Sequence, residues 1–340
     1  MIDDFVRRDG PILLEGARDY KIAGANCYYL AYVDESVQSG VLDLAASMHL
    51  NAIRLWAFWE NLPPNGIFFE RLDRVISMAA ERRIRLILTL ANNWKDFGGI
   101  PEYLKRFDLA GHDQFYRDGR CRAAYWIWAE QLIGRINTIT GRPYKEEPAI
   151  LAWELANEPR CPDVEDGEEL LISWIWEMST LIRSKTPNHL IAVGDEGFFH
   201  RAGARRSELY NGSRGTNFEA ILGIGPVDFG TYHMYGEWAK KDDLTEWGLI
   251  WIREHVAAAR RANKPVLLEE YGAAKLPNRA QVYDTWLREI ETSNAVGDLL
   301  WMLGLPKSTE QPYDPDSYVI AGGPEIDVIR DHAKRLLGVN

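Results

Sequence analysis

Short runs of apolar and β-branched residues recur along the chain, and segments with apolar residues at near-helical spacing separate them. The runs are almost continuously apolar, as in parallel strands that are covered on both faces. They span Ile22–Tyr28, Ala52–Trp56, Ile84–Leu90, Ile150–Leu155, Leu190–Gly194, Val227–His233, Val266–Glu270 and Asp298–Met302. The spacing predicts helices at Gly40–His49, Phe69–Glu81, Arg122–Ile139, Glu168–Lys185, Thr245–Ala262, Arg279–Ser293 and Pro324–Leu337. The segment His200–Gly225 is irregular, with at most a short helix near Phe218–Leu222.

Alternation of strands and helices in one undivided chain predicts a (β/α)8 TIM barrel, with an open doubly wound sheet as the alternative. No low-complexity stretch or linker divides residues 1–340, so we interpret them as a single domain. Loop insertions are expected on the C-terminal face, Gly98–Cys121 among them. Barrels of this kind carry their active sites at the C-terminal ends of the strands. Polar residues at the ends of the runs are therefore the candidates for function.

Charge and composition exclude several classes of protein. The net charge is -11 and no basic cluster stands out, which argues against a nucleic-acid partner. No run approaches the ~18 apolar residues of a membrane-spanning helix. The acidic start Met1–Phe5 has no secretion signal, which predicts a cytoplasmic protein unless a signal was removed. Cys27, Cys121 and Cys161 have no metal-like spacing and predict reduced thiols, with one disulfide plus a free thiol as the alternative.

The 13 tryptophans are an unusually large number for this length. Tryptophan offers a flat apolar face and one N–H donor. Sugar rings present flat C–H faces edged with hydroxyl groups. An excess of tryptophan beside many carboxylates therefore indicates either a carbohydrate site or a tryptophan-rich core, and composition alone does not separate the two.

Two glutamates stand at the ends of runs that lie nearly across the predicted barrel from each other. Glu158 follows the fourth run and Glu270 ends the seventh. Cleavage of a glycosidic bond needs two carboxyl groups, one to protonate the leaving oxygen and one to attack the anomeric carbon or activate water. Arg54, in the second run, carries a permanent charge that can hold a carboxylate ionised. These three residues predict a glycosidase site.

Other polar and aromatic residues at the same rim suit sugar binding. Asn157 offers an amide to a sugar 2-hydroxyl, Tyr235 a hydrogen bond to the nucleophile, and Trp301 a stacking face. Three residues after the third run are predicted to line the cleft, namely Asn92, Asn93 and Trp94. Three further tryptophans are candidates for outer subsites or for the core, namely Trp56, Trp59 and Trp238.

Other chemistries lack their motifs. There is no Gly-x-Ser-x-Gly elbow, no Walker loop and no dinucleotide-binding glycine pattern. The 7 histidines are scattered without a His-Glu-x-x-His pair. We therefore predict neither a metal site nor a cofactor.

The strings at these strand ends resemble glycoside hydrolase family 5, whose barrel carries catalytic glutamates on strands 4 and 7. "NEP" at Asn157–Pro159 is the most specific element, because Glu158 matches the acid/base of that family. Glu270, just before Tyr271-Gly272, matches its nucleophile. The residues that match positions around the sugar at the cleavage site are Arg54, Asn157, His233, Tyr235 and Trp301.

Three strings are similar to the endo-β-1,4-mannanase branch of that family. They are "WELANEPRC" at Trp153–Cys161, "NNWKDFGG" at Asn92–Gly99 and "GDEGF" at Gly194–Phe198. The resemblance implies β-mannan or manno-oligosaccharide substrates, no metal, and a retaining double displacement with carboxyl groups ~5–5.5 Å apart. The missing signal, and a Gly98–Cys121 segment that closes one end of the cleft, would favour an exo-acting β-mannosidase. The same residues are also compatible with a β-1,4-glucanase and with an inactive carbohydrate-binding barrel.

The neighbouring acids receive structural interpretations. Glu269 and Glu270 are adjacent in a strand and are expected to face opposite ways, with Glu269 structural. Glu154 is assigned to the opposite face from Asn157, as a buried and paired acid. His233 is predicted to hydrogen-bond a sugar hydroxyl. Two further rim acids, Asp195 and Glu196, are left open between substrate contact and hydrogen bonding at the rim.

Overall fold

Eight parallel strands form the centre of the molecule. The computed structural model describes residues 2–58, 66–204, 207–240, 243–273, 276–305 and 318–339. The strand order is β8-β7-β6-β5-β4-β11-β10-β9. Backbone bonds connect the two end strands through residues that flank them, since the N–H of Asp228, just before β9, donates to Ile191 O at 2.8 Å and that of His233 donates to Glu196 O, after β8, at 3.1 Å. The strands are β4 (Ile22–Asn26), β5 (Ala52–Trp56), β6 (Arg85–Thr89), β7 (Ile150–Glu154), β8 (Leu190–Ala192), β9 (Gly230–Tyr235), β10 (Val266–Gly272) and β11 (Gly297–Leu300).

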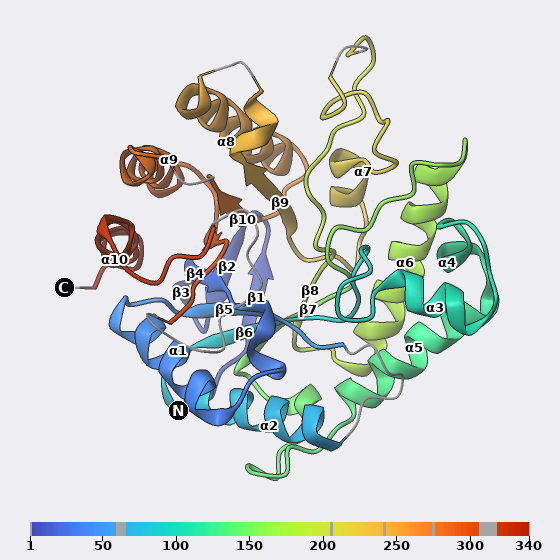
Figure 1. Cartoon of the computed structure of the whole chain (residues 1–340), viewed down its shortest axis with the longest axis horizontal. Helices are drawn as coiled ribbons and strands as arrows, with labels where there is room; N and C mark the ends of the chain where they lie inside the picture. Colours follow the sequence, from blue (N-terminus) through green and yellow to red (C-terminus); the bar gives the residue numbers. More distant parts are fainter. Residues whose placement is uncertain are drawn as a thin grey trace.

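Helices surround these strands, which confirms the TIM barrel (Figure 1). The α-helices are α1 (Glu35–Ser47), α2 (Gly66–Glu81), α3 (Ile100–Arg106), α4 (Gln114–Arg117), α5 (Gly119–Ile133), α6 (Gly167–Lys185), α7 (Phe218–Leu222), α8 (Leu244–Arg261), α9 (Arg279–Thr292) and α10 (Pro324–Leu337). Short 3-10 turns are η1 (Tyr28–Ala31), η2 (Tyr144–Glu146) and η3 (Gly236–Ala239). Over the described ranges, no helix combines the length and apolarity needed to span a membrane. All three cysteines are buried free thiols.

Helix α1 begins at Glu35, five residues before the predicted start at Gly40, and two further helical segments differ from the sequence-based expectation. The helix predicted to reach residue 139 ends at Ile133, because the chain beyond it turns back onto Asp73 of α2. Arg135 Nη2 donates to Asp73 Oδ2 at 2.6 Å, and Thr138 Oγ1 does so at 2.8 Å. The expected loop Gly98–Cys121 contains α3 and α4, which pack against α5 and α6. The buried aromatic residues of Gly98–Cys121 make this segment part of the helical layer.

A small antiparallel sheet, which the sequence pattern did not predict, plugs the barrel at the N-terminal ends of its strands. It consists of β1 (Val6–Asp9), β2 (Ile12–Glu15) and β3 (Arg18–Asp19). Val6 and Leu13 are 2% and 1% exposed and join the inner apolar cluster of the barrel. Strands of two to four residues are too short to show a clear hydrophobic period.

Inward-facing positions change from apolar to polar along the strands. On β5, Ala52 belongs to the inner apolar cluster, whereas Arg54 lies two residues further on. On β7, Ala152 is followed in the same way by Glu154. Because side chains alternate between the two faces of a strand, these pairs point into the barrel. The lower interior is therefore an apolar core, and the upper interior is a buried polar layer.

Candidate active site

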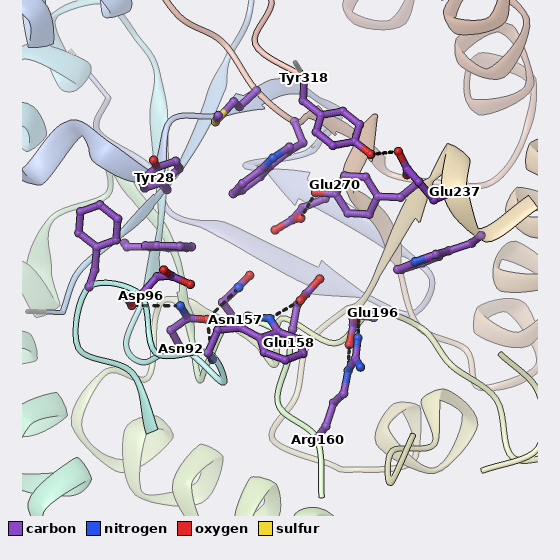
Figure 2. A pocket seen from close by; sticks show the side chains of 17 residues that line it. Tyr28, Asn92, Asp96, Asn157, Glu158, Arg160, Glu196, Glu237, Glu270 and Tyr318 are labelled. Atoms are coloured by element: carbon purple, nitrogen blue, oxygen red, sulfur yellow. Dashed lines mark hydrogen bonds and ion pairs between the residues drawn. The ribbon is translucent and has the colours of Figure 1, made fainter. Parts of the chain in front are cut away.

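A pocket of about 520 Å³ opens at the C-terminal ends of the strands (Figure 2). It lies where the polar layer of the barrel reaches the surface. The predicted site residues that line it are Trp56, Asn92, Trp94, Asn157, Glu158, Tyr235, Trp238, Glu270 and Trp301. Three other predicted residues, Arg54, Asn93 and His233, are buried and do not line the pocket, so the prediction that Asn93 lines the cleft is wrong. The structure therefore brings the predicted set together in two layers.

Arg54 is the centre of the buried layer and is 1% exposed. Its Nη1 donates to Glu270 Oε1 at 2.6 Å and to Asn26 Oδ1 at 3.0 Å. Its Nη2 donates to Glu154 Oε1 at 2.7 Å and to Asn157 Oδ1 at 2.8 Å. A buried guanidinium requires charged and hydrogen-bonded partners, and its planar fork fixes their positions. Arg54 thereby holds the ends of β4, β7 and β10 in one geometry.

Glu269 and Glu270 both reach the barrel interior, so the prediction that they face opposite ways is wrong. The pairing of β10 with β9 shifts register between Leu268 and Glu270. Such a bulge inserts an extra residue and re-aims the side chains around it. Glu269 Oε2 consequently lies 3.7 Å from Arg54 Nε and 3.4 Å from His233 Nε2. Local strand periodicity cannot reveal a bulge that depends on the partner strand.

Glu154 is a buried and paired acid, as predicted, but it is not directed away from Asn157. Both side chains accept hydrogen bonds from Arg54. Strand β7 ends at Glu154, and a bridge between Asn92 and Asn157 turns the following loop inward. Burial acts to raise the pKa of Glu154, but Arg54 and the hydroxyl of Thr89 outweigh burial and lower it. Glu154 therefore carries the negative charge that faces Arg54.

Glu270 points into the pocket from β10 and is 2% exposed. Arg54 donates to its Oε1 and the Tyr235 hydroxyl donates to its Oε2. Burial raises the pKa of Glu270, with a further contribution from Glu158, while His233, Arg54 and Tyr235 act in the opposite direction. Its carboxylate is held by donors on both oxygens, which fixes its orientation.

Glu158 approaches the same pocket from the loop after β7. Its backbone has a φ of 52°, a left-handed conformation that is uncommon for a residue with a side chain and is found at functional sites. Trp94 Nε1 donates to its Oε2 at 2.6 Å, and His233 Nδ1 lies 2.9 Å from its Oε1. Burial acts to raise the pKa of Glu158, but His233, Arg160 and Trp94 bring it down to about 2.

One oxygen of Glu158, one of Glu270 and a ring nitrogen of His233 lie within 4.8 Å of one another. His233 is wholly buried, so the prediction that it contacts a sugar hydroxyl is wrong. Burial acts to lower the pKa of His233, but Glu270, Glu158 and Glu269 raise it well above its usual value. The cluster is therefore built for hydrogen bonding and proton transfer.

An aromatic surface forms one side of the pocket. The ring of Trp301 stacks on Tyr28 at 5.8 Å between centroids, and Tyr28 contacts Trp56 at 4.6 Å. Phe97 closes this group against Tyr28 at 5.4 Å. Trp56 thus has both predicted roles, because it lines the pocket and is 6% exposed. Trp59 lies outside the described residues.

A charged surface forms the other side. Arg160 makes a two-pronged ion pair with Glu196, and its guanidinium lies 5.1 Å from the ring centre of Trp94. Burial and the Glu158 carboxylate raise the pKa of Glu196, while Arg160 lowers it. Asp195, in contrast, is a rim hydrogen-bonding residue, since Thr216 Oγ1 donates to it at 2.8 Å.

Sequence reasoning missed several lining residues. Arg160 stands two positions after Glu158, within a motif that was recognised, so a usable signal was present. Glu237 and Tyr318 meet at one edge of the pocket, where the Tyr318 hydroxyl donates to Glu237 (Figure 2). No local pattern could have paired residues so far apart in sequence. The described residues of Gly98–Cys121 do not line the pocket, so this segment does not close one end of the cleft.

Comparison with known proteins agrees with this geometry. The family model described as "GH family 5 beta-mannosidase-like" matches residues 64–286. The probable mannan endo-1,4-beta-mannosidase F of Emericella nidulans is 32% identical over 95% of this chain and 76% of its own length. The mannan endo-1,4-beta-mannosidase A of Podospora anserina is 33% identical over 95% of this chain and 89% of its own. The chain therefore belongs to glycoside hydrolase family 5.

Solved structures show the same relationship. The endo-1,4-beta-mannanase of Rhizomucor miehei superposes with a TM-score of 0.91 at 34% identity, covering 98% of this chain and 99% of that one. The endo-1,4-beta-D-mannanase of Thermotoga petrophila gives 0.86 at 37% identity, covering 93% and 99%. A family 5 mannosidase of Rhizomucor miehei gives 0.83 at 20% identity, covering 99% of each chain, which shows a shared fold alone.

Proposed function

We propose that this protein is a retaining endo-β-1,4-mannanase in which Glu158 is the acid/base and Glu270 the nucleophile. The observation that carries the proposal is the approach of their carboxylates to within 4.8 Å at the pocket. Retaining glycosidases hold the two carboxyl groups close, whereas inverting enzymes leave room for a water molecule between one of them and the sugar. Relatives above 30% identity bear names that specify internal cleavage of mannan, which supports the substrate and the mode of attack.

The first chemical step needs a protonated Glu158. His233 Nδ1 and Glu158 Oε1 lie 2.9 Å apart and share one proton, which rests on His233 in the free site. Transfer of that proton to Glu158 creates the acid, which then protonates the glycosidic oxygen. Glu270 attacks the anomeric carbon as the bond to that oxygen breaks. The products are a mannosyl ester of Glu270 and a released sugar chain with a free hydroxyl.

The second step uses the same residues in reverse. Ionised Glu158 accepts a proton from water, which attacks the anomeric carbon and displaces Glu270 as a carboxylate. The lowered pKa of Glu158 keeps it ionised, as this step requires. Arg54 and Tyr235 stabilise the departing carboxylate through the bonds they already make to it. Trp301 offers its ring face to the sugar beside Glu270.

A time course of product sizes from mannohexaose labelled at its reducing end tests the proposal. Internal cleavage predicts labelled dimers and trimers from the earliest times. A ladder that shortens by one mannose at a time would instead establish an exo-acting β-mannosidase. Cellohexaose is the matched substrate control, and faster hydrolysis of it would establish a glucanase.

Stereochemistry tests the retaining mechanism separately. Proton NMR of the first product should show the β-anomer before mutarotation. A first-formed α-anomer would contradict the assignment of Glu270 as nucleophile. Binding of mannohexaose without any product would establish a carbohydrate-binding barrel in place of an enzyme.

A further inference from the structure

Two carboxyl groups meet beneath the pocket, where they touch neither substrate space nor solvent. Glu154 and Glu269 are both 0% exposed, and neither lines the pocket. Arg54 Nε lies 3.0 Å from Glu154 Oε2 and 3.7 Å from Glu269 Oε2. The two side chains are within hydrogen-bonding reach of each other. Two carboxylates therefore compete for one N–H group inside the barrel.

Their hydrogen bonds are unequal. Glu154 accepts from Arg54 Nη2 at 2.7 Å and from Thr89 Oγ1 at 2.8 Å. From the cationic side chains that the structure describes, Glu269 receives longer contacts, 3.7 Å from Arg54 and 3.4 Å from His233. Its Oε1 is buried without a hydrogen-bond partner among the described residues. A proton on Glu269 would give this carboxyl a donor and Glu154 a further bond.

The charge balance points the same way. Glu154, Glu158, Glu269 and Glu270 surround two cationic side chains, Arg54 and His233. Unpaired buried charge is costly, and two carboxyl groups that share a site cannot both ionise freely. Burial, followed by the charge of Glu154, raises the pKa of Glu269 to about 8, which agrees with this geometry.

We propose that Glu154 and Glu269 share one proton, carried by Glu269, and that the neutral carboxyl is a positioning residue that lets His233 pass its Nδ1 proton to Glu158. This role for Glu269 rests on the proposed acid function of Glu158. The shared proton itself does not depend on the substrate. It is a property of the folded site.

His233 is the link between the two pairs. Its Nε2 faces Glu269 at 3.4 Å, and its Nδ1 faces Glu158 at 2.9 Å and Glu270 at 3.4 Å. The other charged groups that act on it or on these partners from neighbouring elements are Arg54 on β5, Arg160 after β7, and Asp195 and Glu196 after β8. Trp251 of α8 donates to its backbone carbonyl at 2.8 Å and adds no charge.

The protonation of Glu269 decides what His233 can do. An ionised Glu269 would hold His233 as an imidazolium and oppose transfer of its proton. A neutral Glu269 accepts a hydrogen bond from Nε2–H whether the ring is charged or not. The Nδ1 proton is then governed by the two catalytic carboxylates alone. Glu269 therefore holds the ring through Nε2 and leaves its charge to the catalytic carboxylates, without touching the reacting atoms.

Neutron diffraction from wild-type crystals at neutral pH in deuterated solvent tests the shared proton directly. We expect one deuteron between the Glu154 and Glu269 carboxyl groups. A map without a deuteron on either group overturns the proposal, whatever the enzyme does to mannan. Failure of the mannan assay alone would reject the proposed function and leave the shared proton standing.

Kinetics of two near-isosteric variants test the positioning role. Glu269→Gln keeps a neutral hydrogen-bonding group, so kcat should stay within about threefold of wild type with the same pH profile. Glu269→Leu removes the acceptor for His233 and should lower kcat by about tenfold or more. Glu154→Gln, the contrasting variant, removes the counter-charge of Arg54 and should lose at least about 100-fold.

Two kinetic results would overturn the role of Glu269. One is a loss in Glu269→Gln as large as in Glu269→Leu, because an ionised Glu269 would then be required. The other is a shift of the acidic limb of the Glu269→Gln profile by about one pH unit or more, which would mean that a negative charge had acted on His233. Both measurements stand even if Glu154→Gln fails to fold.

Discussion

The two ends of the barrel are built from the same strands, but one end buries apolar side chains and the other buries charged ones. At the N-terminal ends, Val6 and Leu13 of the small sheet complete an apolar core. At the C-terminal ends, the next inward positions carry Arg54, Glu154 and Glu270 around a pocket. The lower end buries apolar surface, which stabilises the fold. The upper end buries charge, which is costly and is retained where chemistry needs it.

This contrast indicates that function and stability are separable along one strand. A substitution of a residue that lines the pocket should change turnover first, and a substitution in the lower core should change stability while turnover stays at its wild-type level. Each of the following experiments is a test of that separation, in order of decreasing effect.

Glu270→Ala should have the largest effect, with a loss of about 10⁴-fold or more in kcat, because the covalent intermediate can no longer form. Steady-state hydrolysis of mannohexaose measures it. Glu130→Ala is the control, since that residue makes a surface ion pair with Lys185 of α6 and should leave kcat unchanged. Near-normal turnover by Glu270→Ala would show that Glu270 is not the nucleophile.

Glu158→Gln should lower kcat on mannohexaose by about 10²–10⁴-fold, because the leaving oxygen is no longer protonated. The loss should be much smaller with an aryl mannoside whose phenolate leaves without protonation. Comparing the two substrates in the same variant provides the control. Equal losses on both would remove Glu158 from the acid role.

Leu13→Ala should cost about 2–5 kcal/mol of stability, because it opens a cavity in the inner core. Turnover at 25 °C should stay at the wild-type level. Thermal and denaturant unfolding measure the change. Ile12→Ala, on the same strand but 37% exposed, should change stability by less than about 0.5 kcal/mol. Equal losses of stability in the two variants would contradict the conclusion that Leu13 of the small sheet completes the barrel core.

The lower end should also contribute to the loss of folding stability at acidic pH. Burial lowers the pKa of His189, beside the start of β8, to about 4. The unfolded chain, with an ordinary histidine pKa near 6.5, then binds more protons between these values. Stability is therefore full above about pH 6.5 and falls as the pH drops toward 4, by up to about 3 kcal/mol for this group.

His189→Gln should flatten the fall of unfolding free energy between about pH 6.5 and about pH 4.5. His255 on α8 is buried in the same way, with its pKa lowered to about 4, so His255→Gln should flatten the curve similarly. The kcat of His189→Gln at pH 7 should be unchanged. An unaltered slope in both variants would show that these histidines do not remain neutral in the fold.

Trp94→Phe should have the smallest effect, a loss of about 3- to 10-fold in kcat. It removes the 2.6 Å hydrogen bond to Glu158 Oε2 but keeps most of the ring surface. Trp176→Phe, at an exposed position of α6, is the control and should have no effect. A Trp94→Phe variant as active as wild type would mean that this hydrogen bond does not orient Glu158.

Much of the fold was predictable because strand and helix periods are local. The pattern located the barrel strands to within a few residues, and α7 and α10 have the predicted bounds. The end of α5 was not predictable, because Asp73 on another helix draws Arg135 and Thr138 into a turn. The β1–β3 sheet was missed because its stability comes from filling the barrel, which no local period records.

The residues of the site were likewise predicted in part. Glu158, Glu270 and their aromatic neighbours were predicted from motifs and all line the pocket. How deeply each of these residues is buried was not predicted. His233 was expected to touch sugar, yet it is buried against Glu158. Glu269 was expected to face away, yet the bulge in β10 turns it toward Arg54.

The amino-acid sequence by itself determined which side chains stand at the ends of the strands, because periodicity and motifs are properties of the chain. From these the barrel fold and the glycosidase chemistry could be predicted. Folding established which carboxylates share a cation, which is buried and which meets the pocket. Those facts depend on strand register, bulges and contacts between residues that are distant in sequence. Charge pairing and burial set pKa values, so the division of roles among Glu154, Glu158, Glu269 and Glu270 exists only in the folded barrel.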